Sequence, residues 1–284
     1  MTRPMTRPVT RPMTRIAHLS DLHFGRVDDR AVGALVEDLR ALAPDLVVVS
    51  GDLTQRARRK QFREARAFLD SLERPLLVVP GNHDVPWHIL PGRFLGPHGR
   101  FRRIISPDTR PIYREGDLIV AGLPTSRAAV AHWNWSLGRI STSGAQRVAQ
   151  AFHHHSEAGL RILVTHHPLV PMEGVGHRHV AFNAKRALAI LGAARVDVLL
   201  AGHVHRSQSG CVTLPGGAQG DWHCVTAQAA SAVSTRLRGE PNGYNLIEVE
   251  GTSMAVQTRI WEPGEAAFRE GEVKRYRRGN GGWG

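Results

Sequence analysis

The chain has 284 residues, 42% of them hydrophobic and 22% charged, which is sufficient for one folded domain with a sizeable core. No apolar run approaches the roughly 20 residues that span a bilayer, and the first residues lack the apolar segment of a secretory signal, so we expect a cytoplasmic protein without a transmembrane segment. The formal charge of +12 favours anionic partners, but all except three of the 37 basic residues are arginines, a skew typical of coding bias, so nucleic acid is the less favoured partner.

The ends of the chain differ from its middle in composition. The first residues repeat the triplet Thr-Arg-Pro, from which no core can be built, so residues 1–14 are expected to form a disordered arm. A folded domain is predicted over residues 15–264, with residues 85–117, rich in Pro, Gly and Arg, as a small cap-like insertion. Residues 265–284 form a basic, Gly-rich tail, which we expect to be frayed from Lys274 onward.

Short apolar runs alternate with amphipathic segments through the first two thirds of the domain. Strands are predicted at 16–20, 46–50, 76–79, 118–122, 161–165 and 196–201, and helices at 31–42, 58–72, 143–158 and 184–194. Uninterrupted apolar runs of this length are typical of strands buried on both faces, with helices packed outside them. After residue 210 the pattern changes to hairpins at 210–214, 223–228, 243–249 and 254–260, which predict an antiparallel sheet.

Metal-binding side chains follow several predicted strands, at the point where each apolar run stops. The stretches are Asp21-Leu22-His23, Gly51-Asp52, Gly81-Asn82-His83-Asp84, His166-His167 and Gly202-His203-Val204-His205. In open α/β sheets the carboxyl ends of the strands meet along one edge, so these side chains are expected to lie close together. One such stretch alone is more often a turn, but five in this order predict a metal site.

The donor set fits two divalent ions held side by side. Asp21 and Asp52 offset two of their four positive charges, while neutral imidazoles and the Asn82 amide offset none. A bridging hydroxide would leave about one positive charge, which suits a phosphodiester monoanion. Mixed imidazole and carboxylate ligands favour Mn, Fe, Zn or Co over Ca and Mg. Asp52 is the natural bridge, because each of its oxygens can bind one ion. The ions would then lie roughly 3.5–4 Å apart and lower the pKa of a shared water, the nucleophile expected to attack the phosphorus.

Two residues beside the ligand Asn82 are candidates for catalysis. The ring of His83 can reach over the site without binding metal, so we assign it to protonating or stabilising the leaving oxygen. Asp84 is expected to hold the imidazole of His83, as carboxylates orient histidines elsewhere. Of the remaining histidines, His177 and His179 are interpreted as loop surface in preference to substrate contacts.

The five stretches resemble the pattern of the calcineurin-like metallophosphoesterases, over residues 15 to about 260. The Asp after Gly-Asn-His and the His-His-Pro sequence are most similar to the class III cyclic nucleotide phosphodiesterase branch. The resemblance implies an α/β fold of four layers, α/β/β/α, in which helices flank two mixed sheets.

The resemblance also implies how the ligands divide between the two ions. One ion would be held by Asp21, His23, Asp52 and His205, and the other by Asp52, Asn82, His166 and His203. It favours His166 over His167 as the ligand of the fourth stretch.

Hydrolysis of a small phosphodiester is therefore the leading hypothesis, with 3′,5′-cyclic AMP as the first candidate. Another small diester is the alternative: a glycerophosphodiester, a 2′,3′-cyclic nucleotide or a nucleotide-linked lipid. A DNA repair-type nuclease is allowed by the basic charge, and a scaffold without catalysis is the least favoured, because no ligand position is missing. Trp87, Trp133 and Trp135 are interpreted as packing residues in preference to base-stacking ones, and an exposed strand edge in the terminal hairpins would allow a homodimer.

Overall fold

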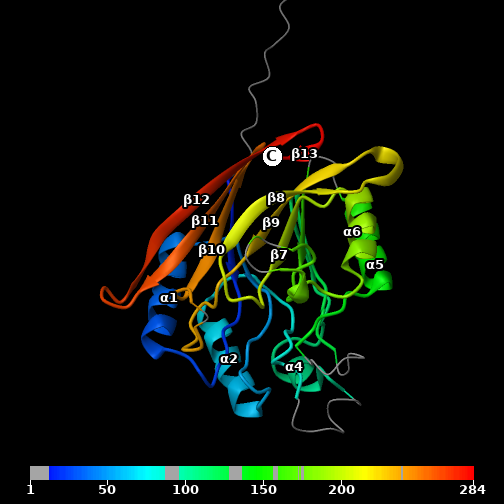
Figure 1. Cartoon of the computed structure of the whole chain (residues 1–284). Helices are drawn as coiled ribbons and strands as arrows, with labels where there is room; N and C mark the ends of the chain where they lie inside the picture. Colours follow the sequence, from blue (N-terminus) through cyan, green and yellow to red (C-terminus); the bar gives the residue numbers. More distant parts are fainter. Residues whose placement is uncertain are drawn as a thin grey trace, which may run out of the picture.

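The computed structural model describes residues 13–86, 96–127, 136–155, 159–171, 173, 176–237 and 239–284. Most of the predicted N-terminal arm and the three tryptophans Trp87, Trp133 and Trp135 lie outside these residues. Strands and helices follow the alternation expected from the sequence, and they form two sheets that face each other with helices on the two outer sides (Figure 1).

The first sheet combines parallel and antiparallel strands. Strands β1, β2 and β3 are parallel, and β10, β11 and β12 extend the sheet in antiparallel fashion beyond β1, in the order β3-β2-β1-β10-β11-β12. Their bounds are β1 Thr14–Leu19, β2 Leu46–Val49, β3 Leu76–Val78, β10 Gly243–Glu250, β11 Ser253–Glu262 and β12 Ala267–Gly279.

The second sheet is mixed as well. Strands β5, β6, β7 and β9 are parallel, while β4 and β8 pair in antiparallel fashion with β5 and β9. The short β13 pairs with β12 and with β9 and so links the two sheets. The bounds are β4 Ile112–Glu115, β5 Leu118–Gly122, β6 Leu160–Val164, β7 Val198–Ala201, β8 Gln208–Leu214, β9 Trp222–Gln228 and β13 Gly282–Trp283.

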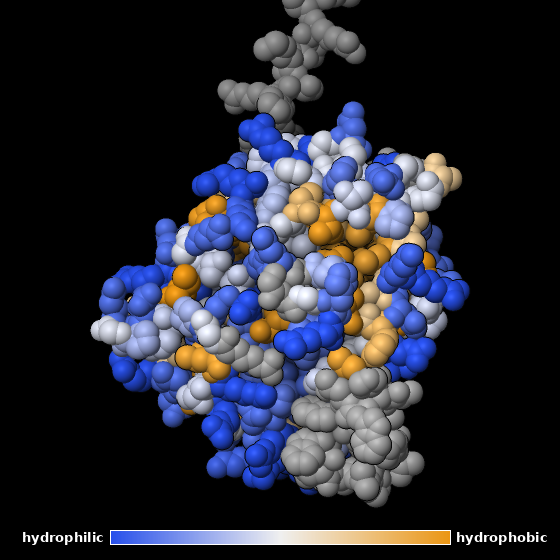
Figure 2. All heavy atoms as spheres, in the orientation of Figure 1, coloured by the Kyte–Doolittle hydropathy of each residue, from blue (hydrophilic) through white to orange (hydrophobic). Residues whose placement is uncertain are grey.

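Helices cover the outer face of each sheet, which gives the predicted four layers. The helices of the first sheet are α1 Asp29–Leu42, α2 Arg59–Ser71 and α4 Gly99–Ile104, and those of the second are α5 Thr142–His153 and α6 Ala184–Ala193. Among the described helices, none is both long and apolar enough to cross a bilayer. Figure 2 shows a mostly hydrophilic face, with hydrophobic residues gathered where β8 and α6 lie.

Successive side chains of a strand point to opposite faces of its sheet. The core therefore has three parts, one between the two sheets and one under the helices on each outer side. Ile16 points between the sheets, where it joins Val48, Ile162 and Val198, whereas its neighbour Ala17 packs under the helices of the first sheet. All these side chains are buried. The uninterrupted apolar runs in the sequence are therefore strands with a hydrophobic layer on either side, as predicted.

The expectation of an antiparallel sheet after residue 210 needs correction. The strands after residue 210 do not form a separate antiparallel sheet, because β9 is parallel to β7 while β10 pairs with β1. The described part of the predicted cap, 85–86 and 96–117, belongs to the domain: Phe101 and Ile105 of the α4 region pack into the core with α2, and β4 is an edge strand. Residues 87–95 lie outside the described residues.

The C-terminal tail is not frayed, contrary to the expectation for Lys274 onward. Strand β12 pairs with β11 along most of its length, and the side chain of Trp283 in β13 is only 1% exposed, within the layer between the sheets. Its indole Nε1 donates to Asp197 Oδ1 at 2.9 Å. The basic residues misled the prediction because Arg275 and Arg277 are exposed, while Tyr276 between them is buried and Lys274 and Arg278 are only partly exposed.

Replacing Trp283 with alanine should lower the free energy of unfolding by about 3–5 kcal/mol, the usual cost of removing a buried aromatic side chain. Chemical denaturation of wild type and variant measures this loss. Arg277→Ala provides the control, because Arg277 is exposed on the neighbouring strand β12. A loss below about 1 kcal/mol would show that β13 is not part of the cooperatively folded domain.

Candidate metal centre

The predicted ligands lie on loops that leave the strands with unusual backbone geometry. Positive φ angles occur at Asp21 (51°), His23 (52°), Asp52 (53°), His203 (73°) and His205 (58°). This left-handed conformation is unfavourable for residues with a Cβ, costs on the order of 1–3 kcal/mol each and is typical of functional sites. The loops after β1 and β2 hold it in place, since Asp21 N donates to Gly51 O at 3.1 Å and His23 N to Asp52 O at 2.9 Å.

Glycines allow these loops to approach one another closely. A Cβ on Gly81 would lie 2.1 Å from Asp52 Oδ1, and one on Gly202 would lie 1.7 Å from Ser20 Oγ and 2.6 Å from Asp21 Oδ2. Of the three glycines that precede ligands, Gly51 has a positive φ, 98°. Gly81 and Gly202 are needed because neighbouring loops pass close to them, and not because their backbone is left-handed.

One cluster of donor atoms gathers around the carboxylate of Asp21. Its Oδ1 lies 3.6 Å from His23 Nε2 and 3.3 Å from His205 Nε2, and these two nitrogens are 3.4 Å apart. Asp52 Oδ2 lies 3.9 Å from His23 Nε2. Ligands bound at roughly 2.0–2.2 Å around one ion are separated by about 3–3.6 Å. The cluster is therefore close to the arrangement that a single transition-metal ion requires.

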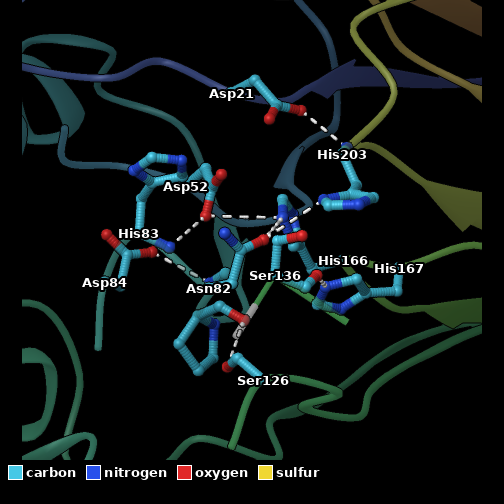
Figure 3. Close-up of polar contacts among 12 residues, drawn as sticks. Asp21, Asp52, Asn82, His83, Asp84, Ser126, Ser136, His166, His167 and His203 are labelled. Carbon is cyan, nitrogen blue, oxygen red and sulfur yellow. Dashed lines mark hydrogen bonds and ion pairs between the residues drawn. The ribbon is translucent and has the colours of Figure 1, made fainter. Parts of the chain in front are cut away.

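A second cluster of donor atoms faces Oδ1 of Asp52, whose Oδ2 faces the first cluster. His166 Nε2 lies 3.4 Å from Asp52 Oδ1 and 3.0 Å from Asn82 Oδ1, and His203 Nδ1 lies 3.2 Å from Asn82 Oδ1. In Figure 3, Asp52, Asn82, His166 and His203 converge on one region. The structure thus brings all the predicted ligands into two adjacent clusters, with one oxygen of Asp52 turned toward each.

Hydrogen bonds separate the roles of His166 and His167. His166 Nδ1 donates to the carbonyl oxygen of Ser50 at 2.8 Å, which leaves the lone pair of Nε2 directed at the second cluster. His167 Nε2 donates to Ser136 O at 2.8 Å, and its Nδ1 accepts from Thr125 Oγ1 at 2.8 Å. Both nitrogens of His167 are thereby occupied, so the geometry favours His166 as the ligand.

The charges of the site fit divalent cations. Asp21 and Asp52 are buried, and Asp21 Oδ1 has no hydrogen-bond partner among the described residues. Burial alone would raise the pKa of both carboxyls, but nearby imidazoles, chiefly His205 for Asp21 and His166 for Asp52, hold each pKa well below its usual value. Burial alone would lower the pKa of His166, but the negative charge of Asp52 outweighs this effect and raises the pKa to about 9. Buried carboxylates that stay ionised among imidazoles form a set of donors suited to transition-metal ions.

His83 lies beside the first cluster and is held at three points. Its backbone N–H donates to Asp52 Oδ1 at 2.8 Å, its Nδ1 donates to Gln55 O at 2.8 Å, and Arg236 Nη1 lies 3.0 Å from its Nε2. Its ring meets the ring of His23 edge-on, with centroids 4.9 Å apart. Burial, with further contributions from His23 and Arg236, lowers the pKa of His83. The imidazole is thus positioned next to the clusters with both nitrogens engaged outside them.

Comparison with known proteins agrees with this geometry. Residues 14–207 match the family profile described as calcineurin-like phosphoesterase. The chain belongs to the calcineurin-like phosphoesterase family. The family predicted from the five stretches is confirmed, and so is the general class of enzyme, a metal-dependent phosphoester hydrolase.

Individual relatives match different shares of this chain. It is 27% identical to a cAMP/cGMP dual specificity phosphodiesterase of Mycobacterium tuberculosis over 258 residues, 82% of this chain and 75% of the relative. It is 42% identical to a glycerophosphodiester phosphodiesterase of Enterobacter lignolyticus over 80 residues, 24% of this chain and 29% of the relative. A purple acid phosphatase of yellow lupin, Lupinus luteus, is similar in fold with a TM-score of 0.66 at 12% identity, covering 93% of this chain and 53% of that one.

Asp84 does not play the expected part in this phosphoesterase. Its two oxygens accept hydrogen bonds from the backbone N–H groups of Leu53, Thr54 and Gly81, at 2.9–3.2 Å, and from the Thr54 hydroxyl at 2.9 Å. Burial and the nearby Asp52 raise the pKa of Asp84 to about 6. The side chain points into the turn behind the ligands, because several N–H groups converge there. Asp84 joins the loops after β2 and β3, and the Gln55 carbonyl holds the His83 imidazole in its place.

Three residues near the candidate metal centre were not recognised as functional from the sequence. Gln55 and Arg236 contact His83, and His179, expected to be loop surface, has its Nδ1 3.5 Å from His203 Nε2. Arg236 lies in an irregular segment and is one of many arginines, so nothing in the pattern marked it. Gln55 acts through its backbone carbonyl, which leaves no trace in the sequence.

Proposed function

We propose that this protein is a dinuclear metal-dependent phosphodiesterase that hydrolyses a small phosphodiester. The observation that carries the proposal is the pair of donor clusters that share Asp52, since two ions a few ångströms apart are typical of phosphoester hydrolysis with water. Asp21, His23, Asp52 and His205 would hold one ion, and Asp52, Asn82, His166 and His203 the other. Mn, Fe, Zn or Co are the ions that such ligands favour.

The residues around the ions determine which substrate charge is accepted. When bound, two divalent ions supply positive charge at the phosphate and a water of lowered pKa. Asp21 and Asp52 are the carboxylates in the two clusters, and the histidines and Asn82 add no negative charge. A surplus of positive charge therefore remains, which favours binding of a monoanionic phosphodiester.

His83 acts on the leaving oxygen in this proposal. Its Nδ1–H is held by the Gln55 carbonyl, so Nε2 is the atom through which the ring can hold or transfer a proton. The backbone hydrogen bond from His83 to Asp52 keeps the main chain of His83 next to the shared ligand. Nε2 accepts from Arg236 in this structure, so it would first take up a proton and release that hydrogen bond before protonating the alkoxide that forms when the P–O bond breaks.

The leading substrate is 3′,5′-cyclic AMP, supported by similarity to the mycobacterial cyclic nucleotide phosphodiesterase over most of the chain. A glycerophosphodiester is the alternative, supported by the higher identity to the Enterobacter enzyme over a short segment. The test is turnover of the manganese-loaded protein on a panel of cyclic nucleotides, glycerophosphodiesters and nucleotide-linked lipids. Failure to hydrolyse cyclic AMP, together with efficient turnover of another diester, would overturn the first assignment. Failure on every diester would overturn the proposed function.

A further inference from the structure

We propose that an arginine-lined pocket next to His83 binds a second anionic group of the substrate, a phosphate or carboxylate carried on one arm of the diester. This inference rests on the proposed phosphodiesterase function and narrows its substrate class. The pocket is a cavity of about 250 Å³ lined by Arg26, Gln55, Arg56 and Arg236, and no carboxylate is among these lining residues.

The pocket adjoins the proposed catalytic histidine directly. Arg236 Nη1 lies 3.0 Å from His83 Nε2, and the Gln55 carbonyl accepts from His83 Nδ1 at 2.8 Å. Two of the pocket residues therefore contact the two nitrogens of one imidazole. The backbone N–H of His83 donates to Asp52 Oδ1, so the same residue contacts both the pocket and the shared ligand. A single small substrate can reach both places.

Backbone hydrogen bonds hold the three segments of the pocket together. Arg26 O accepts from Thr235 N at 2.8 Å, which joins the first segment to the segment of Arg236. Gln55 N donates to Phe24 O at 3.0 Å and so joins the second segment to the first. The fold therefore brings the backbones of the three arginines to one pocket.

Two of the three arginines that line the pocket carry charges that no described acidic side chain offsets. Arg26 and Arg56 are exposed, and within the described part of the chain neither forms an ion pair. Guanidinium groups bind phosphate and carboxylate through paired hydrogen bonds, which makes arginine the favoured residue for such groups. Cavities that hold a whole ligand usually measure about 300–1,000 Å³, so this smaller one suits a single anionic group.

A matched pair of chromogenic diesters tests the proposal. Thymidine 5′-(4-nitrophenyl phosphate) and the same compound with a 3′-phosphate differ only in the second anion, and nitrophenolate release reports both reactions. Wild type should prefer the 3′-phosphorylated compound in kcat/KM. Arg26→Gln and Arg56→Gln should each reduce this preference about tenfold, chiefly through KM, as expected for loss of a charge-assisted hydrogen bond.

The control is Arg275→Gln, which removes the same charge from an exposed position on β12 and should leave the preference unchanged. The pocket proposal is wrong if Arg26→Gln affects both substrates equally, or if wild type does not prefer the 3′-phosphorylated compound. The proposed phosphodiesterase function would stand in either case. Loss of oligonucleotide cleavage without a change in the preference would assign the arginines to a nucleic-acid backbone instead. If wild type releases no nitrophenolate from either compound or from bis(4-nitrophenyl) phosphate, the function itself fails and the pocket proposal with it.

Discussion

Asp52→Ala is expected to abolish diester hydrolysis and to reduce the bound metal from two ions to one or none. The side chain offers one oxygen to each donor cluster, so its removal takes a ligand from both ions at once. It also removes the acceptor of the His83 backbone N–H, which positions the catalytic ring. Both losses act at the same point, and this variant should therefore have the largest effect on activity of any single substitution.

Metal analysis by mass spectrometry and diester turnover, each on protein loaded with manganese, measure these two effects. Asp221→Ala is the control, because Asp221 is exposed immediately before β9. Thermal unfolding of both variants shows whether the fold is retained. An Asp52→Ala protein that still binds two ions per chain would show that Asp52 is not the shared ligand.

His83→Ala is expected to leave both ions bound and to reduce the rate by about 10²–10⁴, the usual contribution of a general acid or base. The ring lies next to the first cluster, and its nitrogens contact Gln55 and Arg236, so metal content should be retained. The loss should shrink for a diester with a 4-nitrophenolate leaving group, because that group departs without a proton. Single-turnover rates on an activated and an ordinary diester provide the comparison.

Arg63→Ala serves as the matched control for this experiment, since Arg63 is exposed on α2. An equal loss for both leaving groups would argue against proton donation and for a role in binding. A loss of bound metal in His83→Ala would instead make the ring a ligand.

The sequence predicted the elements whose signal is local. The apolar runs that became β1, β2, β6 and β7 are buried on both faces, and a predicted ligand follows each of them, so position along the chain was enough to select Asp21, Asp52 and the pair His166-His167 as candidates. The choice between His166 and His167 needed the family pattern, because only the three-dimensional contacts with Ser50 and Ser136 distinguish the two rings.

Features that depend on distant backbone groups were beyond prediction. The partner of the His83 imidazole is the carbonyl of Gln55, and any residue carries a carbonyl. Asp84 was given a catalytic role because it follows His83, yet the N–H groups that it accepts from come from the loop after β2 and from Gly81 of its own loop. The basic residues of β12 looked like a solvated tail, because its two large buried residues, Phe268 and Tyr276, are too far apart in the sequence to show the alternation of a strand.

The left-handed backbone at the ligand positions has a consequence for how the protein can be evolved in the laboratory. A library screened for heat resistance alone should accumulate glycine or asparagine at positions such as Asp21 and His203, because these residues relax the unfavourable torsion angles. Such variants would survive the screen and no longer hydrolyse their substrate. Stability and catalysis are therefore opposed at the same residues, and selection must reward turnover to keep them.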